Sequence, residues 1–433
     1  MRPDLVRRLA GLSVPRYTSY PAVADFSPAV GPRQAAAWLG ALDPGRPVSV
    51  FLAAPKQAEA APRTAAAAGY EAALRAEIAL VAAGLQARLP VSRIAWGRGM
   101  PEILGARGLA AVLCELAGHF QLPPGLDHAI ALDPDLLDPA FCTALAALGV
   151  NRASLRIEDI DPAPRAASGR ERPLGTARAA ASMLRRAGIR RLDLHIADGL
   201  PHQTGAGLVR ACREALALVP DRLVLHADAP LPTARPDRGR IELDALPAAE
   251  ERVRRAEAVD RTLRAHGYRA VGIDHYARPC DPLAVAARNG RLHRDVETYT
   301  DDDAPNLVGF GASAISRLPG GYAQNVPDLA AYGSSVAAGR LATARGHALS
   351  PEDRERGAII ERLICDFSVD LGPRAARYGD ELALLRPFVA DGLLETRGQT
   401  LRLTREGRPF VHLVCALFDQ FRTDGGSRLA EAV

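Results

Sequence analysis

Three polar residues that could act in acid–base chemistry and anion binding lie close together in the stretch GIDHYARP (272–279), directly after a predicted strand. An arginine such as Arg278 can bind a carboxylate through two parallel charge-assisted hydrogen bonds. His275 can gain or lose a proton near neutral pH. The same residue types, with Asp274, also form hydrogen-bonded networks that only fix a strand end. Asp274, His275 and Arg278 are therefore catalytic candidates, and both interpretations stay open.

Other polar residues have the composition of a metal site without its spacing. His195, His202 and His226 follow neighbouring predicted strands and could bind a metal, although lone histidines are more often hydrogen-bonding core residues. The three consecutive aspartates at 301–303 cannot all face one ion, so we predict a solvated loop or a helix cap there. The chain's cysteines lie at least 28 positions apart, which is typical of neither a disulfide framework nor a metal-ligand set.

The elements that must position these residues alternate in type along the chain. Apolar, β-rich runs occur at 48–53, 93–99, 128–133, 152–158, 191–197 and 222–228. Segments between them carry apolar residues at helical spacing. Near-continuous apolar strands that alternate with helices indicate a parallel sheet covered by helices. The pattern alone fits an open barrel and a doubly wound sheet equally, and in both folds ligands bind at the C-terminal ends of the strands.

The pattern changes near the C-terminus. Helical runs at 354–367 and 381–395 precede a strand-like run at 400–404 and another helical run at 411–421. We predict an N-terminal extension at 1–43, a barrel at 44–345 and a separate C-terminal domain at 346–433.

Several long motifs, in one order, resemble a single family. They are PRYTSYPAVADFSP (15–28), GIDHYARP (272–279), LVGFGASAISR (307–317), GGYAQN (320–325) and RLICDFSVDLG (362–372). By these motifs the chain is identified as a member of the oxygen-independent coproporphyrinogen III oxidases, radical S-adenosylmethionine (SAM) enzymes of haem biosynthesis. The resemblance implies an α/β fold, a radical-SAM-type partial (β/α)6 barrel with an N-terminal extension and a winged-helix-like C-terminal domain.

The resemblance also implies a [4Fe–4S] cluster held by three cysteines after the first strand. The corresponding positions here are Gln57, Ala61 and Thr64. Thiolates are the soft, anionic ligands that such clusters require, and alanine has no donor atom. We therefore expect no metal site and no cofactor, with both the cluster and SAM lost.

The positions that resemble the family's SAM contacts are retained only in part. Arg98 interrupts a glycine triplet between Gly97 and Gly99, where a side chain would intrude. Arg156 replaces a glycine, and His195 replaces an acidic residue. The predicted remnant of the SAM site comprises Phe51, Gly97, Gly99, Glu158, Arg170, Ala229 and Ile315.

The N-terminal motif PRYTSYP closes over the active site in the family and is complete here. Tyr17 and Tyr20 are thus further catalytic candidates, but both could simply be packing residues that seat the extension. A retained arginine such as Arg278 could bind a tetrapyrrole propionate.

Bulk composition excludes several other classes. The formal net charge is +4 over 433 residues, and no run approaches the roughly 18 apolar residues of a membrane span. Arg402, Arg405 and Arg408 could suggest DNA binding, yet Glu406 among them favours a solvated face. We predict a cytoplasmic monomer without a nucleic-acid or membrane partner.

These observations favour a degenerate oxidase-like protein of the haem pathway that binds a tetrapyrrole, coproporphyrinogen or haem, or has a regulatory role. One alternative is an active coproporphyrinogen III dehydrogenase, which converts two propionates to vinyl groups using SAM and the cluster. A second alternative is an interaction protein that acts through its C-terminal domain on DNA or another chain.

Overall fold

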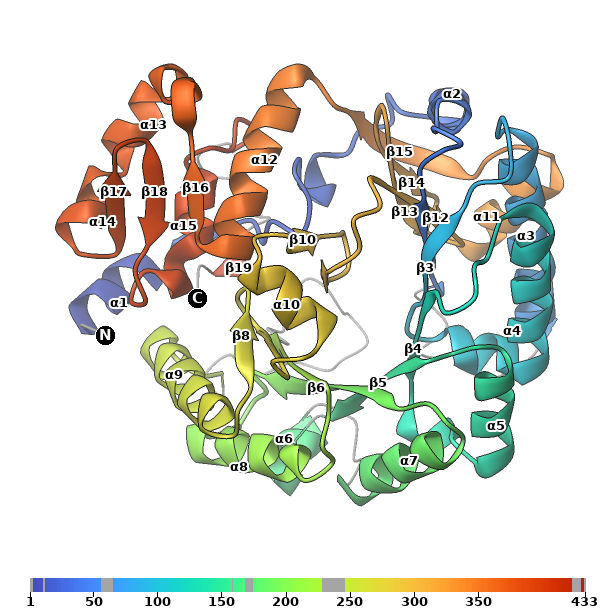
Figure 1. The fold of residues 1–433 in the computed structure, drawn as a ribbon, viewed down its shortest axis with the longest axis horizontal. Coiled ribbons are helices and arrows are strands. Elements are labelled where there is room, and N and C mark those ends of the chain that lie inside the picture. Colours follow the sequence, from blue (N-terminus) through green and yellow to red (C-terminus); the bar gives the residue numbers. More distant parts are fainter. Residues whose placement is uncertain are drawn as a thin grey trace.

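One twelve-stranded sheet organises most of the chain (Figure 1). The computed structural model describes residues 3–10, 12–55, 65–157, 159–167, 174–227, 246–422 and 430–431. The strand order is β15-β14-β13-β12-β2-β3-β4-β5-β6-β7-β9-β8. No helix among the described residues is both long and apolar enough to cross a membrane.

Six consecutive parallel strands form the centre of the sheet, and they confirm the six predicted runs. They are β2 (Val48–Leu52), β3 (Val91–Trp96), β4 (Asp127–Leu132), β5 (Arg152–Ile157), β6 (Arg191–Asp198) and β7 (Arg222–Ala227). The main helices between or after them are α3 (Ala65–Ala83), α4 (Met100–His119), α5 (Pro139–Ala147), α7 (Leu174–Arg186), α8 (Gly205–Leu216) and α9 (Ala249–Ala265), with the short α6 (Pro162–Ala167).

The strand order distinguishes the open barrel from the doubly wound sheet. The central strands follow one another in sequence order without a reversal. Because the crossovers between parallel strands share one hand, all their helices then lie on the same side of the sheet. Figure 1 shows these helices outside a curved sheet. The predicted partial barrel is thus confirmed over the doubly wound alternative.

Antiparallel strands extend the sheet at both edges. At one edge, β12 (Asn306–Phe310) pairs in parallel with β2 and is followed by β13 (Ile315–Leu318), β14 (Gly321–Asn325) and β15 (Thr343–Ala348). At the other edge lie β9 (His275–Ala277) and β8 (Arg269–Val271). Between these edges the chain forms α10 (Pro282–Arg288) and the β10–β11 hairpin (His293–Arg294 and Tyr299–Thr300), while α2 (Pro32–Gly40) and α11 (Leu329–Ala337) lie near β15 and α3.

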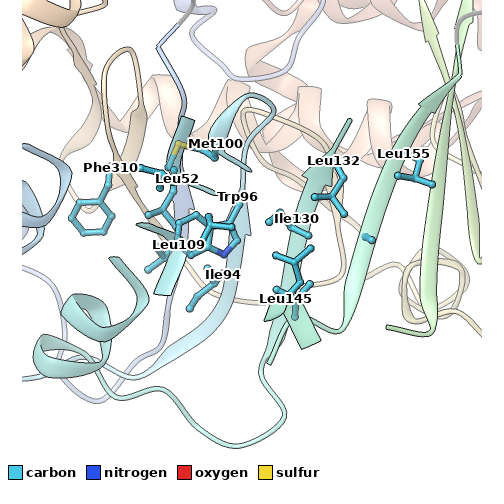
Figure 2. Close-up of a cluster of buried hydrophobic side chains, with 14 of the residues drawn as sticks. Leu52, Ile94, Trp96, Met100, Leu109, Ile130, Leu132, Leu145, Leu155 and Phe310 are labelled. Carbon is cyan, nitrogen blue, oxygen red and sulfur yellow. The ribbon is translucent and has the colours of Figure 1, made fainter. Parts of the chain in front are cut away.

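The main apolar core lies between the sheet and the outer helices. Figure 2 shows Ile94, Trp96 and Ile130 of the strands gathered with Leu109 of α4 and Leu145 of α5. All five side chains are buried. Since side chains alternate along a strand, this packing directs every second residue to the inside of the barrel.

The C-terminal part combines helices with a three-stranded sheet in the order β16-β18-β17, as the resemblance predicted. Its elements are α12 (Pro351–Asp366), β16 (Ser368–Asp370), α13 (Gly379–Leu384), α14 (Arg386–Ala390), β17 (Leu394–Arg397), β18 (Thr400–Leu403) and α15 (Val411–Ala416). The divisions after residues 43 and 345 remain predictions.

The N-terminal segment packs against both the barrel, where α1 lies beside α9, and this C-terminal part. α1 (Pro3–Ala10) contributes Leu5 and Val6 to an apolar cluster with α12 and α15, and β1 (Ser13–Val14) pairs with β19 (Ala430–Glu431). The Tyr17 hydroxyl donates to Asp419 Oδ2 at 3.0 Å, and the Gln420 N–H donates to the Tyr20 hydroxyl. Both tyrosines therefore seat the extension on the C-terminal part.

Removing one of these hydroxyls should cost measurable stability. Tyr17→Phe removes the hydroxyl donor to the buried carboxylate of Asp419, which keeps its hydrogen bond from the Phe421 N–H, so we expect the free energy of unfolding to fall by about 1–2 kcal/mol. Tyr20→Phe should cost less, because Gln420 keeps access to solvent. Urea unfolding of the two variants measures the difference; a larger loss in Tyr20→Phe would contradict this ranking.

Candidate functional site

The interior of the barrel is lined by residues that point away from the outer helices. In β5, Ala153, Leu155 and Ile157 belong to the core against those helices. Because neighbouring side chains on a strand point to opposite faces, Arg152 and Arg156 point into the barrel. They lie at its N-terminal and C-terminal ends respectively, and each belongs to a separate layer of charged residues.

The N-terminal layer is a buried ionic network. Arg152 binds Asp193 at 2.7 Å and Asp281 at 3.4 Å. Arg222 binds the other oxygen of Asp281 at 2.8 Å and reaches Asp301 at 3.2 Å. Each charge is thus compensated by a close opposite charge, which is the condition for keeping ions away from water. This layer closes the barrel end away from the strand C-termini.

Asp301 and Asp302 differ from the predicted solvated loop. Asp301 belongs to the ionic layer through Arg222, and Asp302 accepts a hydrogen bond from Ser92 at 2.9 Å and another from Ser49. Asp303 is the solvated member, with its side chain 64% exposed. The three consecutive aspartate side chains therefore point in different directions and contact different groups.

The C-terminal layer is cationic on the β5 and β6 side. Arg156 and His195 are direct neighbours across these strands, and the rings of His195 and His226 lie 6.5 Å apart. Burial, followed by the nearby charge of Arg98, lowers the pKa of His195 well below its ordinary value, and Arg156 acts in the same direction. The three sequence departures at Arg98, Arg156 and His195 therefore gather in one place.

The neighbouring strands β3 and β4 contribute small apolar side chains to this layer. Ala95, Ala129 and Ala131 point inward from β3 and β4, because Ile94, Trp96, Ile130 and Leu132 are in the outer core. A Cβ on Gly97 would lie 3.0 Å from the ring of Phe51 and 3.1 Å from the carbonyl oxygen of Leu52, so a larger residue would require these neighbours to shift. The interior thus carries basic side chains on β5 and β6 and small apolar side chains on β3 and β4.

The mouth of the barrel joins several distant segments. His275 Nδ1 lies 2.6 Å from Asp274 Oδ1, and its Nε2 lies 3.0 Å from the Thr298 hydroxyl. Burial would raise the pKa of Asp274, but His275 and Arg294 together hold it well below its ordinary value, with Arg16 contributing. Arg16 belongs to the N-terminal motif. That motif therefore reaches the charged mouth, and the Asp274–His275 pair is a fixed element of it.

The structure brings together the predicted SAM-site residues that it describes. Phe51 pairs with Gly309 across β2 and β12, and a Cβ on Gly309 would lie 2.5 Å from the carbonyl oxygen of Ile315. Gly99 has a φ of 89°, which strongly favours glycine. The remaining candidates lie outside the described residues: Gln57, Ala61, Thr64, Glu158, Arg170 and Ala229.

Two predicted residues lie apart from the mouth. The Arg278 N–H donates to the carbonyl of Asp221, just before β7, so this exposed residue lies at the N-terminal end of that strand. His202 is exposed and follows β6 with a φ of 60°. Among the described residues, no group of three or more histidine, cysteine or acidic side chains is arranged to hold a metal ion.

Sequence reasoning missed Arg16, Arg294 and the ionic layer around Arg152. Arginines at inward positions of otherwise apolar strands are a signal that could have identified Arg152 and Arg222. Arg16 and Arg294 have no such local signal, since their partners lie on other segments.

The cysteines of this chain do not fit a cluster held by three thiolates. All six fall within the described residues: Cys114 on α4, Cys142 on α5, Cys212 on α8, Cys280 before α10, Cys365 on α12 and Cys415 on α15. Four are buried, Cys142 and Cys212 in the core of the barrel and Cys365 and Cys415 together in the cluster around α12 and α15, and the described residues gather no three of them.

Comparisons with known proteins agree along nearly the whole chain. Residues 349–410 match the family model for the HemN C-terminal domain. An oxygen-independent coproporphyrinogen III oxidase of Bradyrhizobium diazoefficiens is 36% identical over 450 residues, covering all of both chains. That of Paracoccus denitrificans is 35% identical and covers 94% of each. The solved Escherichia coli coproporphyrinogen III oxidase, described as a radical SAM enzyme, superposes with a TM-score of 0.87 at 30% identity, over 94% of this chain and 98% of that one.

Fold and mouth geometry thus define a partial-barrel protein of the radical SAM type. The chain belongs to the oxygen-independent coproporphyrinogen III oxidases.

Family membership corrects one prediction. We expected no cofactors, on the ground that Gln57, Ala61 and Thr64 replace the cluster cysteines. Relatives over the full length carry the oxidase name, and the solved one is a radical SAM enzyme. The expectation of no cofactors is therefore wrong. It inferred the loss of the cluster from a loop outside the described residues, and the loss of SAM from contacts that are retained only in part.

Proposed function

We propose that this protein binds coproporphyrinogen III at the mouth of its barrel and serves its oxygen-independent oxidation, in which two propionates become vinyl groups. The observation that carries the proposal is the full-length match to oxidases of this name, combined with the mouth cluster of Arg16, Asp274, His275 and Arg294. A tetrapyrrole with propionates needs both cationic partners and apolar walls, and both are present here.

Each part of the mouth has a role in this proposal. Arg16 is carried by the N-terminal segment, so seating that segment places a positive charge over the bound ligand. His275 is oriented by Asp274 and Thr298, which fixes the ring where a proton could be held. Phe51, Gly97, Gly99 and Ile315 form the proposed SAM-facing wall, and we propose that Glu158, Arg170 and Ala229 belong to it as well.

A second candidate is a tetrapyrrole-binding or regulatory homologue that holds the ligand without converting it. One observation favours it: no three of the six cysteines come together among the described residues. Activity in this chain would require cluster ligands other than three closely spaced cysteines. The two candidates share the binding site and differ only in turnover.

An anaerobic assay separates the candidates. The full chain is reconstituted with iron and sulfide, its iron and acid-labile sulfide are measured, and it is incubated with SAM, a reductant and coproporphyrinogen III. We expect vinyl-containing product, with the wild-type relative from Escherichia coli as positive control. Saturable binding of coproporphyrin III without product would support the binding homologue instead. Absence of saturable binding would refute both.

A further inference from the structure

The C-terminal part contributes a histidine to the mouth of the barrel. His412 lies on α15, and its ring centroid is 6.3 Å from that of Tyr17 in the N-terminal motif. The charged groups that act on its imidazole are Arg16, Arg294 and Asp274, three members of the mouth cluster. Residues from three distant parts of the chain therefore meet here: the N-terminal motif, the barrel and the C-terminal part.

The imidazole of His412 is uncharged in the folded protein. Burial, followed by the positive charges of Arg16 and Arg294, lowers its pKa to about 3, and the opposing effect of Asp274 is smaller. A neutral imidazole carries one proton, on either Nδ1 or Nε2. His412 is thus a neutral hydrogen-bonding group and adds no positive charge to the mouth.

The surroundings of the two ring nitrogens decide where this proton lies. Nδ1 is buried and has no hydrogen-bond partner among the described residues, whereas the residue as a whole is half-buried. The accessible part of the ring is therefore its Nε2 side. A buried N–H without an acceptor is rare in proteins, so we place the proton on Nε2. His412 then presents a neutral N–H donor at the accessible edge of its ring, beside the mouth cluster.

This arrangement costs stability in the protein without ligand. A buried polar atom without a partner has lost its hydrogen bonds to water and gained none in return. The hydroxyl of the nearby Tyr17 does not compensate, since it donates to Asp419. Arg294, whose charge acts on His412, also has a buried Nη1 that finds no hydrogen-bond partner in the described part of the chain. Unsatisfied buried groups of this kind call for a functional explanation.

We propose that His412 contacts the bound tetrapyrrole and donates a hydrogen bond from Nε2 to one of its propionates. The inference rests on the proposed function. A porphyrinogen offers its hydrogen-bond acceptors on the carboxylates, because its pyrrole nitrogens all carry hydrogen. A hydrogen bond to a charged acceptor is also stronger than one between neutral groups. The proposal thus assigns a ligand contact to α15, in addition to those of the mouth cluster.

The test measures binding of coproporphyrin III to the full chain by porphyrin fluorescence, for the wild type, His412→Phe and His412→Gln. Phenylalanine keeps a planar ring without nitrogens, whereas the amide N–H of glutamine reaches the position of Nε2. We expect His412→Phe to weaken binding roughly tenfold and His412→Gln to recover most of this loss. The tetramethyl ester of coproporphyrin III has no charged acceptor, so its affinity should fall much less in His412→Phe.

Urea unfolding without ligand distinguishes ligand binding from a structural role. His412→Phe removes an unsatisfied buried nitrogen, so its urea midpoint should equal or exceed that of the wild type. The matched controls are His266→Phe and His266→Gln. His266 is exposed at the end of α9, where its Nδ1 lies 2.8 Å from the carbonyl oxygen of Thr262. Both controls should leave the affinity for coproporphyrin III unchanged.

Several outcomes would overturn the inference. If His412→Phe leaves binding of coproporphyrin III unchanged, or weakens acid and ester equally, the hydrogen bond to a propionate is refuted while tetrapyrrole binding stands. A lower urea midpoint without loss of affinity would show that His412 only holds α15 in place. If His412→Phe weakens binding of SAM and not of the porphyrin, the acceptor is the carboxylate of SAM.

Two further results are informative about the protein as a whole. If the wild type binds neither porphyrin, the proposed function fails together with this ligand assignment. Should His412→Phe not fold, His412→Asn takes its place, because the amide of asparagine reaches the position of Nδ1 and not that of Nε2. Glutamine should then keep the affinity for coproporphyrin III and asparagine should lose it; equal affinities would contradict the inference.

Discussion

Replacing Glu77 by leucine should lower the free energy of unfolding by roughly 3–5 kcal/mol. Glu77 lies on α3, its side chain is 2% exposed, and it contacts the turn that follows β12. Its carboxylate accepts hydrogen bonds from the Gly311 N–H at 2.7 Å, the Asn325 amide at 2.6 Å and the Tyr332 hydroxyl at 2.7 Å. Leucine would fill the space but leave all three donors without this acceptor.

The expected loss extends to the geometry beside the proposed SAM-facing wall. Gly311 has a φ of 102°, and a Cβ there would lie 2.4 Å from the carbonyl oxygen of Ala53. Glu77 therefore holds the turn between β12 and β13, which lies against the end of β2. Urea unfolding measures the loss, with Glu115→Leu as control, because Glu115 pairs with Arg75 at the surface. A loss below about 1 kcal/mol would show that water or a rotated side chain satisfies the three donors.

The same carboxylate predicts a pH dependence. Burial raises the pKa of Glu77 to about 7, against the lowering effect of its hydrogen bonds. A folded-state pKa above the unfolded one means that the folded protein binds the proton more tightly. This contribution to stability is therefore present at low pH and lost as the pH rises from about 4.5 to about 7, by up to about 3 kcal/mol.

Glu77→Gln removes this titration. Its amide N–H lies among the three groups that donate to the Glu77 side chain, so the variant should be less stable than wild type at low pH. The difference in their free energies of unfolding should narrow as the pH approaches 7. Urea midpoints of both proteins across this range test the sign. A gap that widens with pH would mean that the three donors favour the carboxylate more than burial disfavours it.

Replacing Asp281 by alanine should destabilise the fold by about 3–5 kcal/mol, because it removes an acidic partner from a buried ionic network and leaves the arginines in place. Asp281 binds both Arg152 and Arg222, and it also accepts the Leu283 N–H at the start of α10 at 2.8 Å. Without Asp281, two nearly buried guanidinium groups lose a partner. Asp281→Asn keeps the helix cap and one acceptor oxygen, so it should cost less than alanine.

Asp303→Ala is the matched control for the ionic layer. Asp303 is exposed and lies 3.7 Å from Arg291, so its removal should cost less than about 1 kcal/mol. Thermal and urea unfolding of the three variants give the ranking. If Asp281→Ala were as mild as Asp303→Ala, water would be replacing the lost carboxylate, and the network would not be sealed from solvent.

The sequence by itself determined the layered architecture and the family. Apolar runs such as 152–158 and 191–197 have strand length, and segments such as 70–85 have helical spacing, so each element is visible in a short window of residues. Long motifs at both ends of the chain identified the family, since they keep their order and spacing. The replacement of the expected cysteines by Gln57, Ala61 and Thr64 was also visible, but it led to a wrong expectation about cofactors.

The tertiary structure alone decided which charges meet. Asp281 follows Arg152 by more than a hundred residues, and no local pattern connects them. Arg98, Arg156 and His195 appeared in the sequence as three separate departures, and only the strand order and register place them in one cluster. Periodicity is a property of neighbouring residues, whereas a charged site depends on how parallel strands align their ends. That alignment, more than any single motif, determines what the barrel interior can bind.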